Sequence, residues 1–289
     1  MDNELRTIDE CYTKFGLKNT SVSENKLPDD VRLQRKIVLT KDELNRIPQN
    51  SSFLMGTLIH EGVQAMLTKN VPVSDVMPII EKKVSDYKHP SEKEIAKAKL
   101  ISKIAEQIIK NFVNEVLKLD NGRFKAETEY MHWNDKIGIV WRMFVDLEGA
   151  EYFFDFKNLF GSVRTNKSGF ALTKRKIDSK IFTSDLMQMA LYSKVVKKKP
   201  CLIYATDEEV MAFHEENTLE LRPDNLQKYY DELIIYQKIW ENKLRYADGD
   251  MKKLASIVKT DFSSIRKDDF WFKDMPSEYN ERLIKLYVW

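Results

Sequence analysis

Apolar residues in the first half of the chain recur at the 3.6-residue period of an α-helix. The pattern predicts one helix over residues 53–68 and a longer one over 91–119. Ser91 followed by Glu94 is the sequence pattern of a capping box, so we expect the longer helix to begin there. Both helices are expected to pack their apolar faces against the rest of the fold.

The period then changes to that of β-strands. Three consecutive segments are rich in β-branched and aromatic residues, namely 124–132, 137–147 and 150–157. The connections between them are short enough for hairpins, so they predict an antiparallel meander. Two further short strands are expected at 202–205 and 210–213.

A polar segment over residues 158–182 is predicted to be a loop. A helix over 183–196, with Thr183 or Ser184 as its N-cap, and a long helix over 223–246 follow. The order is helices, three strands, helix, two strands, helix. This order predicts an α/β fold in which a mixed central sheet is flanked by helices.

The chain has no internal repeat and no long linker rich in Gly, Ser or Pro, which favours one continuous domain. We expect a peripheral N-terminal segment over residues 1–50, a core over 51–250 and a C-terminal segment over 251–289 packed on that core. The aromatic residues of the last segment are expected to anchor it, with base stacking as the alternative.

Composition and charge exclude only a few classes of protein. Hydrophobic residues make up 43% and charged residues 32% of the 289 residues, which is typical of a folded globular protein. The net charge of +2 gives no indication of a nucleic-acid partner. Two cysteines, Cys11 and Cys201, are too few for a disulfide scaffold, a four-thiolate zinc site or an iron–sulfur cluster.

The expected location is the cytoplasm. The opening sequence, MDNELRTIDE, has no apolar segment of the kind that a secretory signal needs. No apolar run approaches the roughly 20 residues of a membrane span. We therefore expect a reducing compartment and no membrane partner.

Two acids and a lysine converge at the ends of two predicted strands. Asp155 and Lys157 are two residues apart, so on a strand they point to the same face. Asp146 ends the preceding strand and can lie beside Asp155 across a short hairpin. Carboxylates are ligands that Mg²⁺ and Mn²⁺ prefer, and a lysine beside them can orient water or stabilise developing negative charge. The pattern is typical of a metal-dependent hydrolase.

This triplet carries little weight by itself. The chain contains seven Asp/Glu-x-Lys triplets, and six of them fall in polar helices or loops as solvated charge. The triplet at 155–157 differs because it ends an apolar strand that follows another acid-bearing strand. Its alternative interpretation is a charged pair on an exposed edge strand.

Three further features change this assessment. Gly56 and His60 lie one turn apart on an apolar helix, where the glycine would permit close packing and the histidine can bind a metal. Glu127 and Glu129 share a face of the strand before Asp146. Gln188 and Tyr192 are four residues apart, so they project together from one helix. Each feature alone has an ordinary explanation: a core histidine, exposed acids, and a packing pair.

Together these residues resemble the RecB-like branch of the PD-(D/E)xK nuclease superfamily, which includes the RecB and AddB nuclease domains, CRISPR-associated exonucleases and the mitochondrial genome maintenance exonuclease. The resemblance rests on five short motifs in order, covering roughly residues 53–240: GTLIH (56–60), ETE (127–129), FVD (144–146), DFK (155–157) and QMALY (188–192). Each motif is weak alone, but their order and spacing are specific.

The resemblance implies a PD-(D/E)xK core and a role for each matched residue. His60, Asp146 and Asp155 would hold one or two Mg²⁺ or Mn²⁺ ions with the backbone carbonyl of Phe156, and Lys157 would be the catalytic lysine. Gln188 and Tyr192 would position the DNA strand or the lysine. Glu129, or with less support Glu127, would serve a second metal or the attacking water.

The sequence departs from the family pattern at two positions. Met143 stands where a glycine often precedes the motif aspartate, and Gln64 stands where a glutamate often follows the histidine by four residues. Neither position is a ligand in the family mechanism. Versions with an iron–sulfur cluster need four cysteines, so no cluster is expected here.

A basic segment directly follows the proposed catalytic lysine. Residues 158–180 contain six basic residues and one acid, Asp178. Such a segment can bind phosphates, and its alternative role is simply a solvated surface. The basic residues proposed to bind substrate are Arg164, Lys174, Arg175 and Lys176. A second basic run at 197–199 would end the preceding helix favourably.

The function expected from these features is a metal-dependent DNA exonuclease that hydrolyses phosphodiester bonds with metal-activated water, in recombination, repair or DNA degradation. The alternatives are a structure-specific endonuclease on the same core and a catalytically inactive DNA-binding protein. No ATP-binding P-loop is present, so the chain is expected to be either a stand-alone nuclease or the nuclease subunit that works with a helicase or recombination partner. The compact size suits a monomeric phage or bacterial enzyme.

Overall fold

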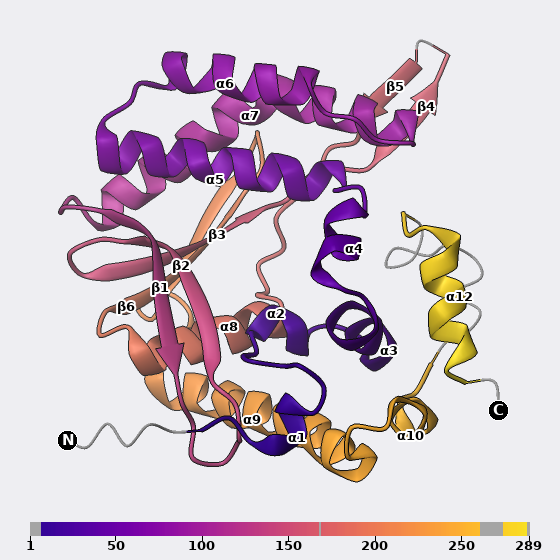
Figure 1. Cartoon of the computed structure of the whole chain (residues 1–289). Helices are drawn as coiled ribbons and strands as arrows, with labels where there is room; N and C mark the ends of the chain where they lie inside the picture. The colour runs from indigo at the N-terminus through magenta and orange to yellow at the C-terminus, as the bar shows by residue number, and fades with distance from the viewer. Residues whose placement is uncertain (1–6, 168, 261–273, 288–289) are drawn as a thin grey trace. The chain divides into compact units, whose positions relative to one another are not determined.

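The computed structural model describes residues 7–167, 169–260 and 274–287 (Figure 1). The C-terminal aromatics Phe270, Trp271, Phe272 and Trp289 lie outside these residues. In chain order the elements are α1 (Glu10–Thr13), α2 (Val22–Asn25), α3 (Asp29–Leu33), the π-helix η1 (Gln34–Val38), α4 (Lys41–Arg46), α5 (Ser51–Lys69), α6 (Val73–Ser85), α7 (Glu92–Leu119), β1 (Lys125–His132), β2 (Trp141–Glu148), β3 (Tyr152–Asn158), β4 (Val163–Asn166), β5 (Gly169–Leu172), α8 (Thr183–Val195), β6 (Lys199–Ala205), β7 (Val210–His214), the 3₁₀ helix η2 (Leu219–Leu221), α9 (Pro223–Ala247), α10 (Met251–Ile257) and α12 (Ser277–Lys285).

The chain divides into two compact units. The central unit comprises Gln49–Glu129 and Phe144–Gln227, and the terminal unit comprises Met1–Pro48, Tyr130–Met143 and Lys228–Trp289. The chain passes from one unit to the other within β1, β2 and α9. All residues proposed for the catalytic site belong to the central unit.

The main sheet has five strands in the order β1-β2-β3-β6-β7. β2 and β3 are antiparallel, β3 and β6 are parallel, and β6 and β7 are antiparallel. The prediction of a mixed α/β fold is therefore confirmed. Two parallel strands need a crossover connection between them, and the segment that contains α8 provides it for β3 and β6.

Strand β2 begins four residues later than the sequence pattern predicts. Ile137–Val140 were expected to belong to it, but the backbone of this segment pairs elsewhere. The carbonyl of Gly138 accepts the N–H of Asp9, and the carbonyl of Val140 accepts the N–H of Thr20. Apolar residues here are buried without forming the expected strand.

Helices cover both faces of the central part of the sheet (Figure 1). On one face, α5, α6 and α7 form a hydrophobic core with alternate residues of β3 and β6, such as Phe154, Phe156 and Ile203. On the other face, α8 packs against Phe153, whose ring lies 6.3 Å from that of Tyr192. β3 is therefore buried on both faces, which explains its nearly continuous apolar sequence.

Two predicted side-chain caps are wrong, although both helices begin where the sequence predicts. Ser91 is the N-cap residue of α7, but its side chain makes no capping hydrogen bond. The Glu94 carboxylate instead accepts the backbone N–H and hydroxyl of Ser51, at 2.9 and 2.6 Å, so it satisfies the start of α5. α8 begins at Thr183 after Phe182 as N-cap, without a side-chain cap.

The segment predicted as a loop contains a separate two-stranded sheet. β4 and β5 pair antiparallel from Val163 opposite Leu172 to Asn166 opposite Gly169. Each strand has only four residues, too few for a recognisable alternation in a polar segment. Arg164 therefore lies on a strand and not in a loop.

The glycine of α5 at which neighbouring helices pack closely is Gly62, and not Gly56 as the sequence predicts. A methyl group on Gly56 would make only an ordinary contact, 3.7 Å from Asn158 Nδ2. A methyl group on Gly62 would lie 2.9 Å from both Ile109 Cδ1 and Val76 Cγ1. Gly62 therefore permits the close packing of α5 against α6 and α7.

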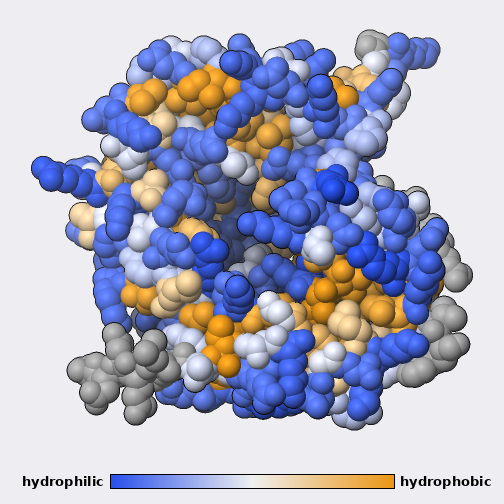
Figure 2. Space-filling model, viewed as in Figure 1, coloured by the Kyte–Doolittle hydropathy of each residue, from blue (hydrophilic) through white to orange (hydrophobic). Residues whose placement is uncertain are grey.

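The surface of the face in Figure 2 is mostly hydrophilic, with an apolar patch over α6, where Ile79 is 56% exposed. Within the described residues, no helix has both the length and the apolar character needed to cross a membrane. Cys11 and Cys201 are both buried free thiols.

Candidate functional site

The strand β3 presents Asp155 and Lys157 on the face that α8 covers. In the parallel pairing, Asp155 lies beside Leu202 and Lys157 beside Tyr204. Lys157 Nζ lies 2.5 Å from Asp155 Oδ2, and the Asp155 side chain is only 1% exposed. A carboxylate this deeply buried is expensive to desolvate even beside a partly exposed lysine, so further polar partners are needed.

Helix α8 supplies those partners through Gln188 and Tyr192. Gln188 Nε2 donates to Asp155 Oδ1 at 2.7 Å and to the Tyr192 hydroxyl oxygen at 3.0 Å. Lys157 Nζ donates to Gln188 Oε1 at 3.3 Å, and the Tyr192 hydroxyl donates to the carbonyl of Phe144 at 2.9 Å. The Gln188 amide thus fixes both charged residues, and Tyr192 links it to β2.

Asp146 lies at the same place on the neighbouring strand. β2 pairs with β3 through Leu147 opposite Phe154, directly after Asp146 in the chain. Asp146 Oδ2 accepts the backbone N–H of Phe156 at 2.8 Å. The hairpin therefore holds the Asp146 carboxylate against the backbone between Asp155 and Lys157.

His60 of α5 reaches the same carboxylate. Its Nδ1 lies 3.7 Å from Asp146 Oδ2, too far for a hydrogen bond. Its Nε2 is buried and has no hydrogen-bond partner within the described residues. The ring is edge-on to Phe156 and Phe112, at 5.7 and 6.3 Å between centroids, so aromatic packing fixes its orientation.

Charge and burial act on these groups in opposite directions. Burial, reinforced by the nearby charge of Asp155, raises the pKa of Asp146. Burial alone would lower the pKa of Lys157, but Asp155, Asp185 and Asp146 together raise it. Burial, with a smaller contribution from the Lys157 cation, lowers the pKa of His60 to about 3. His60 is therefore a neutral imidazole at pH 7, the form that binds metals.

The structure connects Glu127 to this cluster through Gln64. Gln64 Nε2 donates to Glu127 Oε1 and to the backbone carbonyl of Asp146, both at 3.0 Å. Glu127 adopts a left-handed backbone conformation with φ of 49°, which is unusual for a residue other than glycine. Glu127 and Glu129 are both exposed on this strand. The hydrogen bonds of Gln64 thus join Glu127, the acid with less support from the resemblance, to the cluster.

Sequence reasoning missed Asp185 and Tyr204. Asp185 is buried, and its Oδ2 accepts the Tyr204 hydroxyl at 2.7 Å. Because Tyr204 is the β6 neighbour of Lys157, this contact brings the first turn of α8 to the end of β3. One signal could have found Asp185: it precedes Gln188 by three residues and Tyr192 by seven, so the three share a helix face.

The basic residues after β3 are not part of this cluster. Lys174 is ion-paired with Glu208, while Arg175 and Lys176 are exposed. Arg164 is exposed on β4. Within the described residues, none of these four side chains forms a hydrogen bond or ion pair with Asp146, Asp155 or Lys157, so their role as substrate ligands stays a prediction.

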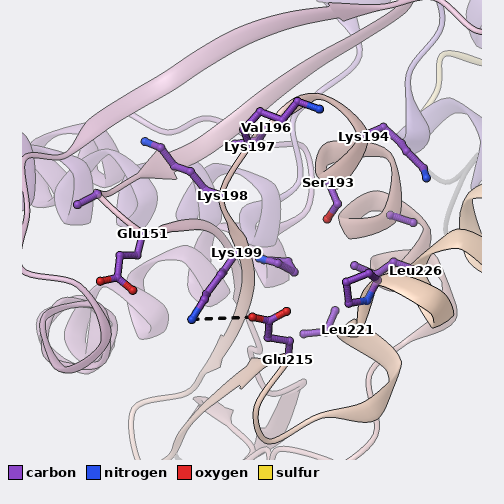
Figure 3. Close-up of a pocket in the computed structure, with 14 residues that line it drawn as sticks. Glu151, Ser193, Lys194, Val196, Lys197, Lys198, Lys199, Glu215, Leu221 and Leu226 are labelled. Atoms are coloured by element: carbon purple, nitrogen blue, oxygen red, sulfur yellow. Dashed lines mark ion pairs between the residues drawn. The ribbon is translucent and has the colours of Figure 1, made fainter.

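Two pockets of the central unit border on residues that the sequence singled out. One, of about 370 Å³, is lined by His60, Lys157 and Asp185 together with Phe53, Asn158 and Phe160; we call it the Phe53 pocket. The other, of about 560 Å³, has lysines at its rim (Figure 3).

The lysines of the larger pocket have structural partners. Figure 3 shows Lys199 and Glu215 facing each other, with 3.9 Å between the charged atoms. Lys199 also pairs with Glu216 at 3.3 Å. Lys198 donates to the carbonyl of Gly149 at 2.5 Å. Lys198 thus joins the start of β6 to the β2–β3 turn, and Lys199 joins it to the segment after β7.

No group of three or more His, Cys, Asp or Glu side chains in the described part of the chain is arranged to hold a metal ion. The candidate donors lie in two sets of contacts. His60 Nδ1 faces Asp146 Oδ2, which accepts the Phe156 N–H, and Asp155 contacts Lys157 and Gln188.

Comparison with known proteins adds little to this geometry. No protein-family model matches the sequence, and no curated protein is significantly similar to it. A crystal structure of the protein SSO0001 is 18% identical, with a TM-score of 0.30, over 65% of this chain and 86% of that chain.

Proposed function

We propose that the chain is a metal-dependent deoxyribonuclease of the RecB-like PD-(D/E)xK type, acting as an exonuclease. The observation that carries the proposal is the buried cluster of Asp146, Asp155 and Lys157, joined by Gln188 through hydrogen bonds to both members of the ion pair. A fold needs no such cluster for stability, because an apolar triplet would fill the same space without desolvating charge.

Two features of the site support a divalent cation there, although its donors are not already gathered around one point. His60 has one buried ring nitrogen without a hydrogen-bond partner in the described residues, and the other faces the Asp146 carboxylate. Burial next to Asp155 raises the pKa of Asp146, a penalty that a bound cation would remove. His60, Asp146 and Asp155, with the Phe156 carbonyl, would hold Mg²⁺ or Mn²⁺. When bound, such an ion polarises a phosphate oxygen and acidifies water.

The protein's own residues would orient and stabilise the reacting groups. Lys157 stays charged because three acids raise its pKa, so its ammonium can stabilise negative charge developing on the phosphate. Gln188 and Tyr192 hold Lys157 and Asp155 in place, which limits reorganisation during the reaction. Glu127 is positioned by Gln64 to accept a proton or orient water near Asp146.

The test is a cleavage assay with Mg²⁺ or Mn²⁺ on end-labelled linear single- and double-stranded DNA and on a covalently closed circle. We expect loss of the linear DNA, intact circles, and at least a 100-fold slower reaction for Lys157→Ala. Lys99→Ala, at an exposed position on α7, is the matched control. Circular dichroism should show that both variants are folded.

Other outcomes would replace the proposal. Cleaved circles would indicate an endonuclease on the same site. Binding of DNA without cleavage under any metal condition would indicate an inactive DNA-binding protein. Cleavage by Lys157→Ala at the normal rate would overturn the assignment of the site.

A further inference from the structure

We propose that the Phe53 pocket binds one unpaired nucleobase of the substrate strand, next to the phosphate that is cleaved. This inference rests on the proposed function and extends it, since it assigns the enzyme a single-stranded end. Its volume of about 370 Å³ lies near the lower end of the range for small-ligand pockets, roughly 300–1,000 Å³.

The position of the pocket links it to the reaction. Both His60 and Lys157 line it, and both belong to the cluster around Asp146 and Asp155. A nucleotide whose phosphate contacts Lys157 therefore has its sugar and base within reach of the pocket. The other walls come from the start of α5 and from the segment that follows β3.

The walls of the pocket suit an aromatic ring. Phe53 is 65% exposed on the first turn of α5, although the apolar positions farther along this helix, such as Met55 and Ile59, are fully buried. Phe160 forms another wall and is itself partly buried against the core. Aromatic side chains that border a cationic groove are the usual platforms on which single-stranded bases stack.

Besides His60 Nε2, a second polar atom of the pocket has no hydrogen-bond partner within the described residues. Asn158 Oδ1 is buried without a hydrogen bond within the described residues, and Asn158 Nδ2 has only a long contact of 3.5 Å, to the Gly56 carbonyl. Leaving a buried amide oxygen unsatisfied is unfavourable, so a ligand with an N–H group is expected to complete it. Amide side chains pair with donor and acceptor groups on base edges. Stacking on Phe53 together with pairing to Asn158 requires a base that is not in a duplex.

The experiment compares single-stranded oligonucleotides that carry one abasic nucleotide, stepped through the first four positions from the cleaved end. At one position we expect the missing base to lower kcat/KM about 10-fold, as loss of base–aromatic stacking predicts. Phe53→Ala should lower kcat/KM on the normal oligonucleotide by a similar factor and abolish the effect of the abasic position. Phe53→Tyr should retain both.

The matched control is Tyr246→Ala, which removes an equally exposed aromatic side chain, 65% exposed, from the terminal unit. This variant should discriminate against the abasic position as the unmodified protein does. Because Phe53 is largely exposed, its replacement should leave the melting temperature nearly unchanged. Asn158→Leu should reduce the preference among the four bases at the same position.

A binding measurement separates this inference from the nuclease proposal. With metal chelated, an oligonucleotide carrying 2-aminopurine at the sensitive position should lose fluorescence on binding, and Phe53→Ala should prevent the quenching. Quenching without cleavage of any DNA would overturn the nuclease and keep the base pocket. Cleavage with no abasic effect and no quenching would overturn the base pocket and keep the nuclease.

Discussion

At the scale of single residues, Glu127 shows what a strand pattern leaves out. Alternation places Glu127 and Glu129 on one face of β1 and does not distinguish them, while the family resemblance favours Glu129. The structure does so through the backbone, because Glu127 has a positive φ and its carboxylate accepts the Gln64 amide. A strained backbone conformation at a polar residue beside a buried acid cluster is the kind of outlier that function maintains.

Two substitutions at Glu127 test this strain. Glu127→Gly should be about 1 kcal/mol more stable than Glu127→Ala, because only glycine adopts this φ without penalty. At a strand position with ordinary negative φ, the alanine variant would be the more stable of the two. Both variants should cleave DNA at least 10-fold more slowly than the unmodified protein, and Glu129→Ala should change the rate less than twofold. Urea unfolding and the cleavage assay measure the two effects.

At the scale of elements, periodicity predicted most of what brings the site together. The two-residue spacing of Asp155 and Lys157 and the four-residue spacing of Gln188 and Tyr192 each fix a shared face, and the structure joins these faces by hydrogen bonds. What the sequence could not show depends on partners far along the chain. Glu94 caps α5 and not its own helix, and the β4–β5 hairpin lies in strands too short for a pattern.

The two glycines of α5 give an element-scale prediction. Gly56→Ala should raise the free energy of unfolding by about 0.5–1 kcal/mol, because alanine favours a helix and its methyl group has room. Gly62→Ala should be less stable than Gly56→Ala, since its methyl group would press on Val76 and Ile109 at 2.9 Å; overpacking of this kind costs about 1–3 kcal/mol. Thermal unfolding of both variants checks this order, and equal stabilities would contradict it.

Asp120 gives a second prediction at the scale of elements, and this one has a defined pH dependence. Its carboxylate accepts the backbone N–H groups of Gly122, Glu151 and Tyr152, at 3.0, 2.8 and 3.1 Å, and so fixes the end of α7 to the β2–β3 turn. Burial alone would raise the pKa of Asp120, but these donors lower it. The stabilisation is therefore complete above the unfolded-state pKa, near 4, and is lost as the pH falls through the lower folded-state pKa.

Asp120→Asn should thus lower the free energy of unfolding by about 1–3 kcal/mol at pH 7. The difference between the variant and the unmodified protein should shrink when the pH falls below 4. Urea unfolding from pH 3 to pH 7 measures it, with Asp75→Asn on the exposed start of α6 as control. A difference that is constant over this range would show that the charge of Asp120 does not stabilise the turn.

At the scale of the whole molecule, the near-neutral net charge makes local charge decisive. A charge of +2 spread over 289 residues cannot concentrate DNA at the protein surface, so a DNA-binding role needs a local excess of cations. The segment after β5 provides one. Lys174 is already paired with Glu208, whereas Arg175 and Lys176 are exposed and have no ion pair within the described residues.

This difference predicts how DNA binding depends on salt. Arg175→Gln combined with Lys176→Gln should weaken binding of single-stranded DNA and reduce the slope of log K against log salt concentration by about 1.4, since each phosphate contact contributes about 0.7. Lys174→Gln should reduce it less, because Glu208 competes with the phosphate. Lys99→Gln combined with Lys103→Gln, which removes the same charge from an exposed face of α7, should leave the slope unchanged. Fluorescence anisotropy between 50 and 300 mM salt measures the slopes, and equal slopes for the two double variants would show that the segment after β5 does not contact the nucleic acid.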